Sequence, residues 1–192
     1  MIDKQLNHFQ KEQQKDESFN SSFESQTSFN TYEQKEGEEL SFKMIKILNS
    51  ISNILNELTI KNSKKQGNKT ENDIFETSEN PNISLLDYLT RIVEYSNCEE
   101  NTLISALIYV DRIAKIKNIT KLNVYKLIFT SILISLKYNE DGIYDNVYYS
   151  QIAGVSVQEL FQMEYEYVLL LNFNFNISEF IFNQYKIALE TI

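Results

Sequence analysis

A run of ten residues without a charge constrains this chain more than any other feature. Between Lys126 and Lys137 every side chain is apolar or small, and no polar stripe interrupts 127–136. A helix that is apolar all round is a buried helix, and this one is too short to span a membrane, which needs about 20 apolar residues. We therefore expect the central helix of an all-helical domain here. Thr120 can cap its start, and Lys137 suits its end.

The composition narrows the class of function. One Pro and four Gly favour helices over a turn-rich β fold. A formal charge of −9 disfavours nucleic acid as a partner, since phosphate binding dominates that affinity. The single cysteine, Cys98, leaves no internal disulfide, and the only histidine, His8, lies in a polar stretch. We expect no catalytic histidine, metal site, cofactor or membrane partner, and a cytoplasmic and/or nuclear location.

The chain divides into four segments by composition. Residues 1–40 are rich in polar and charged side chains, which predicts a disordered tail. Residues 41–60 carry apolar side chains at helical spacing and predict an amphipathic helix that packs on the rest of the domain. Residues 61–82 are polar, which predicts a linker. The domain itself is expected over 83–192.

Capping signals divide 83–192 into consecutive helices. A helix start is indicated where a Ser or Asn precedes an acidic residue by three positions, and a Gly indicates a helix end. The pairs are Ser84 with Asp87, Asn97 with Glu100 and Ser156 with Glu159; a short helix starts at Asp145 or Asn146 and ends at Gly154, and a last helix starts at Asn176 or Ser178. Together with the central helix, these signals predict five helices with short loops, framed by one further helix on each side.

Several stretches resemble the cyclins of the P-type, also called U-type or PHO-type. These stretches are NISLLDYLTRIVEYSNC (82–98), TLISALIYVDRI (102–113), NVYKLIFTSILISLKYNED (123–141), YDNVYYSQIAGVS (144–156) and ELFQMEYEYVLLLNFNFNIS (159–178). Their order and spacing agree with the family over roughly 41–190. The resemblance implies an all-α fold with a single cyclin box of five helices around a buried central helix. An N-terminal amphipathic helix and a C-terminal helix flank the box.

The resemblance implies a regulatory subunit and not an enzyme. A cyclin binds a cyclin-dependent protein kinase as a heterodimer and activates it by positioning the kinase C-helix, whose Glu must pair with the ATP-binding Lys. The positions that match the kinase-binding motif are Lys137 and Glu164, with Glu166 beside them. The positions that match the structural motif of the box are Asp111, Arg112 and Leu127.

The sequence departs from the family at the partner of Asp111. Most cyclins pair this carboxylate with an Arg early in the first helix, and Asn82 stands at that position here. We expect Asp111 to accept a hydrogen bond from the first-helix region, either from Asn82 or from Arg91. The alternative is that the carboxylate faces water.

Three other functions compete with a kinase activator. A cyclin-like scaffold that has lost kinase activation would keep the same sequence pattern. A nucleic-acid module needs a basic face, whereas residues 81–192 carry eight basic and thirteen acidic side chains. An enzyme built on carboxylates such as Glu140 and Asp141 would need a nucleophile, a metal cluster or a phosphate loop, and the sequence shows none.

Overall fold

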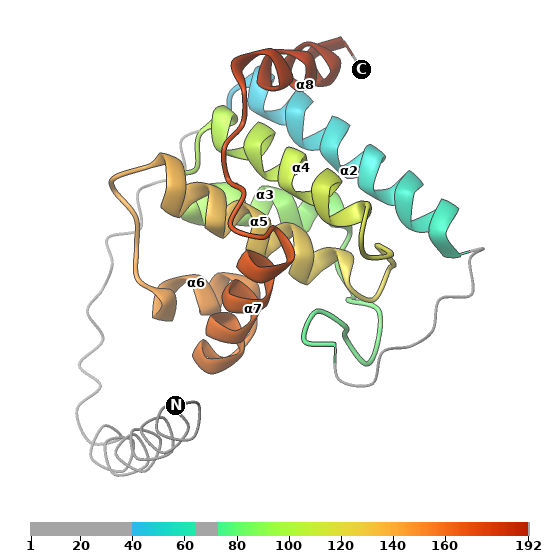
Figure 1. Ribbon diagram of the computed structural model, residues 1–192, viewed down its shortest axis with the longest axis vertical. Helices are drawn as coiled ribbons and strands as arrows, with labels where there is room; N and C mark the ends of the chain where they lie inside the picture. Colours follow the sequence, from blue (N-terminus) through green and yellow to red (C-terminus); the bar gives the residue numbers. More distant parts are fainter. Residues whose placement is uncertain (1–39, 64–72, 192) are drawn as a thin grey trace. The chain divides into compact units, whose positions relative to one another are not determined.

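The computed structural model describes residues 40–63 and 73–191, and within these residues it contains seven α-helices and no strand (Figure 1). The helices are α2 (Phe42–Ser63), α3 (Leu85–Ser96), α4 (Glu100–Ala114), α5 (Val124–Asn139), α6 (Asn146–Ala153), α7 (Val157–Leu170) and α8 (Glu179–Thr191). The predicted all-α class is confirmed. The tail predicted over 1–40 lies outside the described residues, apart from Leu40. No helix of the described segments is long and apolar enough to cross a membrane.

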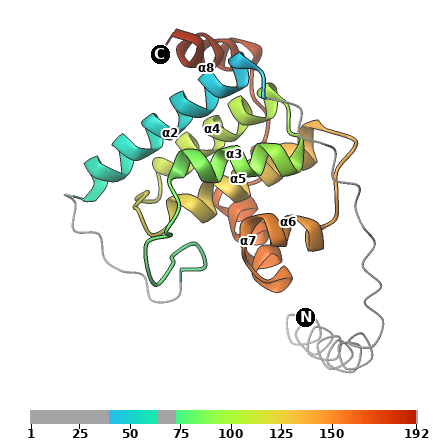
Figure 2. The ribbon, with the colours of Figure 1, turned by 180° about the vertical axis from the view of Figure 1, so that it is seen from behind.

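Helix α5 is the centre of the domain, as its uncharged sequence predicts. It contacts α3, α4, α6 and α7 (Figures 1 and 2), and every residue from Leu127 to Leu136 is buried. Ser131 is small enough for α4 to approach closely, and its hydroxyl donates to the Ala106 carbonyl at 2.6 Å. The helix begins at Val124 rather than near Thr120, because residues 121–123 form a turn.

Most capping signals act where the sequence places them. The Ser84 hydroxyl accepts from the Asp87 amide at 3.1 Å, and the Ser156 hydroxyl accepts from the Glu159 amide at the same distance. Gly154 ends α6 with φ of 73°, a left-handed conformation in which glycine has no Cβ to strain. These local signals are satisfied by residues three or four positions apart and need no tertiary context.

The start predicted at Asn97 is wrong. Asn97 ends α3 in the left-handed conformation, with φ of 52°, and donates its amide to the Val93 carbonyl. Helix α4 begins after Glu99, whose side chain makes no capping bond. Its first turn is capped from another element instead. The Glu140 carboxylate, directly after α5, accepts from the Glu99 amide at 3.2 Å and from the Thr102 hydroxyl.

Helix α2 packs on the domain through one face and contacts α3, α4 and α8 (Figure 2). Ile47, Leu48, Ile51 and Leu55 are fully buried along this face. The helix continues to Ser63, beyond the end that composition suggests at residue 60. Its last turn is held because the Asn62 amide group donates to the Ile119 carbonyl at 3.0 Å.

The second half of the predicted linker over 61–82 packs against the domain. Phe75 is only 1% exposed, and its ring stands edge-on to that of Tyr167 with 6.0 Å between centroids. Asp73, two residues earlier, forms an ion pair with Lys117. One aromatic side chain therefore anchors this polar stretch in the core.

Candidate functional site

Three helices bring a lysine, an asparagine and a glutamate into one ring of hydrogen bonds. Lys137 lies in the last turn of α5, Asn146 is the first residue of α6, and Glu164 lies in the middle of α7. The Lys137 ammonium donates to Glu164 Oε1 at 2.5 Å and to Asn146 Oδ1 at 2.6 Å. The Asn146 amide then donates to Glu164 Oε2 at 2.5 Å, which closes the ring. We call these three residues the polar ring.

The polar ring lies at the border between the core and the solvent. The side chain of Glu164 is 15% exposed and that of Lys137 is 31% exposed. Leu136, just before the lysine, is buried, and so are Met163 and Tyr167 on either side of the glutamate in the sequence. The backbone of both charged residues is therefore fixed by core packing, while their heads remain accessible to a partner.

Among the residues that the structure describes, the ring leaves hydrogen-bonding capacity unused. An ammonium has three N–H donors, of which Lys137 uses two within the ring. Each oxygen of the Glu164 carboxylate accepts one bond in the ring and has a second lone pair. The site can donate to a carbonyl and accept from an N–H group of a partner without breaking its internal bonds.

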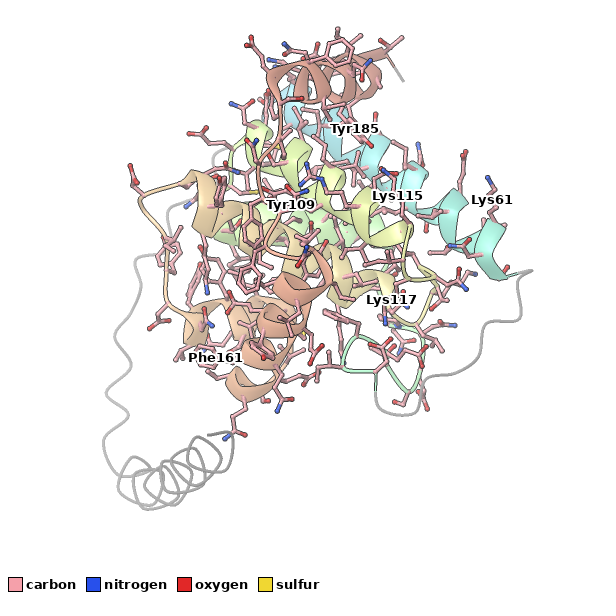
Figure 3. All side chains as sticks on the ribbon, viewed as in Figure 1. Lys61, Tyr109, Lys115, Lys117, Phe161 and Tyr185 are labelled. Carbon is pink, nitrogen blue, oxygen red and sulfur yellow. The ribbon has the colours of Figure 1, made fainter. Side chains whose placement is uncertain are left out.

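An exposed apolar stripe runs along α7 beside the ring. Phe161, Tyr165 and Leu169 follow one another at four-residue spacing, which places them along one side of a helix. They are 57%, 64% and 44% exposed, and Figure 3 shows Phe161 on the α6–α7 side of the domain. We call these residues the α7 stripe. Contiguous apolar side chains of this kind mark interaction surfaces.

The structure separates the two glutamates that the sequence grouped together. Glu164 belongs to the polar ring, whereas Glu166 is exposed. Residues two positions apart on an α-helix point roughly 200° apart. The α7 stripe lies between the directions of Glu164 and Glu166. Lys137 and Glu164 therefore form one site, and Glu166 lies on the far side of the stripe.

The residues predicted as structural lie elsewhere. Leu127, in the first turn of α5, is 1% exposed and belongs to the core. Arg112, in the last turn of α4, donates to the carbonyls of Asn174 and Asn176 at 2.5 and 2.8 Å. The Tyr109 hydroxyl donates to the Phe175 carbonyl at 2.8 Å. These bonds fasten the segment between α7 and α8 to α4, and Figure 1 shows this segment running past α4.

The expected partner of Asp111 is wrong. Its carboxylate pairs with Lys115, directly after the end of α4, at 3.0 Å, and its side chain is 45% exposed. Arg91 donates instead to the Gln151 carbonyl at 3.1 Å. Burial and the neighbouring Asp111 carboxylate raise the pKa of Tyr185, on α8, to about 12. Asp111 thus faces α8 and not α3.

Sequence reasoning missed Asn146 as a member of the site and the role of Glu140. Asn146 was visible only as one of two possible starts of α6, and its bonds reach residues nine and eighteen positions away. Glu140 was a candidate carboxylate for an enzyme, whereas in the structure it caps α4. No local pattern identifies either contact.

Comparison with known proteins gives a single family. The model of the family described as Cyclin matches residues 5–175. Cyclin-U4-3 of Arabidopsis thaliana is 39% identical over 108 residues, which cover 55% of this chain and 49% of that protein. Cyclin-U4-1 of the same plant is 28% identical over 148 residues, covering 74% and 73%. Cyclin-P3-1 of Oryza sativa subsp. japonica is 29% identical over 124 residues, covering 64% and 52%. The chain spans about half the length of the first and third of these relatives.

Proposed function

Because this chain belongs to the cyclin family, with U-type and P-type cyclins as relatives, we propose that it binds and activates a cyclin-dependent protein kinase. The observation that carries the proposal is the polar ring beside the α7 stripe. Within the family, Lys137 and Glu164 match the positions that hold the kinase backbone. In this chain they are joined to each other and remain partly exposed.

The chemistry of the surface fits a kinase C-helix. The ends of any helix carry N–H and C=O groups without partners inside that helix. The spare N–H of Lys137 suits such a carbonyl, and the spare lone pairs of Glu164 suit such an amide. Phe161, Tyr165 and Leu169 offer the apolar surface on which an amphipathic helix is usually bound.

The same surface supports a kinase as the partner. The chain acts as a regulatory subunit in a heterodimer with its kinase, and such signalling interfaces commonly bury on the order of 2,000 Å² or more. The kinase supplies the catalytic groups. We place the complex in the cytoplasm or the nucleus and expect neither nucleic acid nor a membrane as a partner.

The test uses a panel of purified catalytic domains of cyclin-dependent kinases and the full chain. Lys137→Ala and Glu164→Ala should each weaken binding by about tenfold or more, since a charge-assisted hydrogen bond contributes about 1.5–3 kcal/mol. Lys186→Ala and Glu179→Ala, on α8, are matched controls that should bind like the parent. Kinase activity on a generic serine peptide is measured for each mixture.

Each outcome separates the candidates. Binding without a rise in kinase activity supports the scaffold that has lost activation. Binding that is equal in the parent and in all four variants means that the surface is assigned wrongly. If no kinase of the panel binds the parent chain, the proposed function is wrong.

A further inference from the structure

We propose that Asn146 is a positioning residue for the kinase-binding surface, because its side-chain amide holds Lys137 and Glu164 in the arrangement that a partner backbone meets. This inference rests on the proposed function and adds a residue to it. Asn146 itself is not assigned as a kinase contact. It acts through the two charged residues.

The amide of Asn146 supplies one acceptor and one donor at the two places where the ring needs them. Its oxygen accepts from the Lys137 ammonium at 2.6 Å, and its nitrogen donates to Glu164 Oε2 at 2.5 Å. A carboxylate in the same place has no donor to offer Glu164, and an aliphatic side chain has neither group. The ring therefore requires the chemistry of an amide at this position.

The bond to Asn146 also fixes the plane of the Glu164 carboxylate. Lys137 reaches only Oε1, and a single bond to one oxygen leaves the carboxylate free to rotate about its last torsion, which is broad. The second bond, from Asn146 to Oε2, removes that freedom. A partner then meets lone pairs in fixed directions, and less entropy is lost on binding.

The start of α6 is itself held in place, so that Asn146 can act as a fixed support. The Asp145 carboxylate caps the helix by accepting from the Tyr148 amide at 2.9 Å. The Tyr148 hydroxyl donates to the Tyr95 carbonyl, at the end of α3, at 2.7 Å. Tyr149 is buried beneath the helix. Helix α6 thus carries the amide on a backbone tied to α3.

The experiment measures the affinity of the full chain for a kinase catalytic domain that binds the parent. Asn146→Ala and Asn146→Asp should each weaken binding by about tenfold at about pH 7.5, through loss of the amide bonds and, in the second variant, through repulsion from Glu164. Asn53→Asp adds the same charge on the exposed side of α2 and should bind like the parent. Melting temperatures of all variants are recorded beside the affinities.

A pH series distinguishes positioning from a loss of folding. The groups that face position 146 are Lys137 from α5 and Glu164 from α7, and neighbouring Asp145 is engaged in its cap. In Asn146→Asp, Glu164 raises the pKa of the new carboxyl and Lys137 lowers it, and once protonated this carboxyl again offers one donor and one acceptor. The affinity ratio of this variant to the parent should therefore rise as the pH is lowered from about 7.5 towards the pKa of the new carboxyl. The ratio for Asn146→Ala should stay constant.

The failure of this inference differs from the failure of the proposed function. If a kinase binds the parent and the Asn146 variants equally, Asn146 does not position the surface and the inference is overturned, while the proposed function stands. A weakened Asn146→Asp variant whose affinity ratio to the parent falls as the pH is lowered also overturns it. If no kinase binds the parent, both are overturned.

Discussion

Replacement of Phe75 by alanine should destabilise the protein more than its place in a polar stretch suggests. The side chain is 1% exposed, and its ring stands edge-on to Tyr167 at 6.0 Å. Truncation of a buried Phe to Ala typically costs about 3–5 kcal/mol, the sum of lost burial and a residual cavity. The aromatic pair accounts for about 0.5–1.5 kcal/mol of that. For a domain of this size, the melting temperature should fall by about 6–20 °C.

The backbone around Phe75 supports the upper part of that range, because few movements can refill the cavity. Lys126 donates to the carbonyls of Ile74 and Glu76 at 2.9 and 3.3 Å. The Thr77 amide donates to the Leu122 carbonyl at 2.9 Å. Bonds on both sides of the aromatic residue therefore hold the segment against the domain.

Thermal and denaturant unfolding measure the effect, and Phe161→Ala is the matched control. Phe161 is 57% exposed, so its truncation should change the free energy of unfolding by no more than about 0.5 kcal/mol. Hydrogen exchange gives a local measurement. The Thr77 amide, which donates to the Leu122 carbonyl, should exchange faster in Phe75→Ala than in the parent. Equal stabilities of the two Phe variants would refute the packing of Phe75.

Three further outcomes follow from the contacts of α2, α4 and α6. Arg112→Ala should lower the free energy of unfolding, measured in denaturant, by about 1.5–3 kcal/mol, because two bonds to the segment before α8 are lost. Asp111→Ala removes an exposed ion pair and should lower it by no more than about 1 kcal/mol. A larger loss for Asp111→Ala than for Arg112→Ala would refute these roles. Leu55→Asp places a carboxylate without a partner at a position 0% exposed and should lower the melting temperature sharply; an unchanged value would mean that α2 does not pack on the domain. Burial raises the pKa of Tyr149 from 10.0 to about 12, so the folded state favours the neutral phenol. The stability that this shift contributes is complete below about pH 10 and is lost as the pH rises through about 12. Unfolding of Tyr149→Phe should show a shallower loss over that range, and an identical slope would contradict the assignment.

The fold is predictable from the sequence where one element determines its own environment. Ten uncharged residues leave α5 no face to expose, so its burial follows without knowledge of its neighbours. The caps at Ser84 and Ser156 are settled within three residues. Such signals are short-range and do not depend on contacts with distant elements.

Contacts between distant elements escape the same reasoning. Asn97 has the pattern of a helix start, but α4 receives its cap from Glu140, 41 residues after Glu99. Phe75 is a single aromatic residue in a polar stretch, and burial of one residue leaves no periodicity to detect. The carbonyls that Arg112 contacts carry no sequence signature at all. Tertiary geometry decides these three cases.

The candidate site combines both kinds of information. The resemblance to a family indicates Lys137 and Glu164 as kinase-binding positions, and the structure joins them to each other and adds the amide of Asn146 between them. This addition changes how binding should work. A lysine and a glutamate that were free in solution would each lose water and side-chain entropy when a partner arrives. In the polar ring that ordering is already present in the unbound chain, and one donor and several lone pairs remain for the partner. The affinity of the surface should therefore depend on the intact ring as a unit, so that removal of two of its members costs less than the sum of the two single removals.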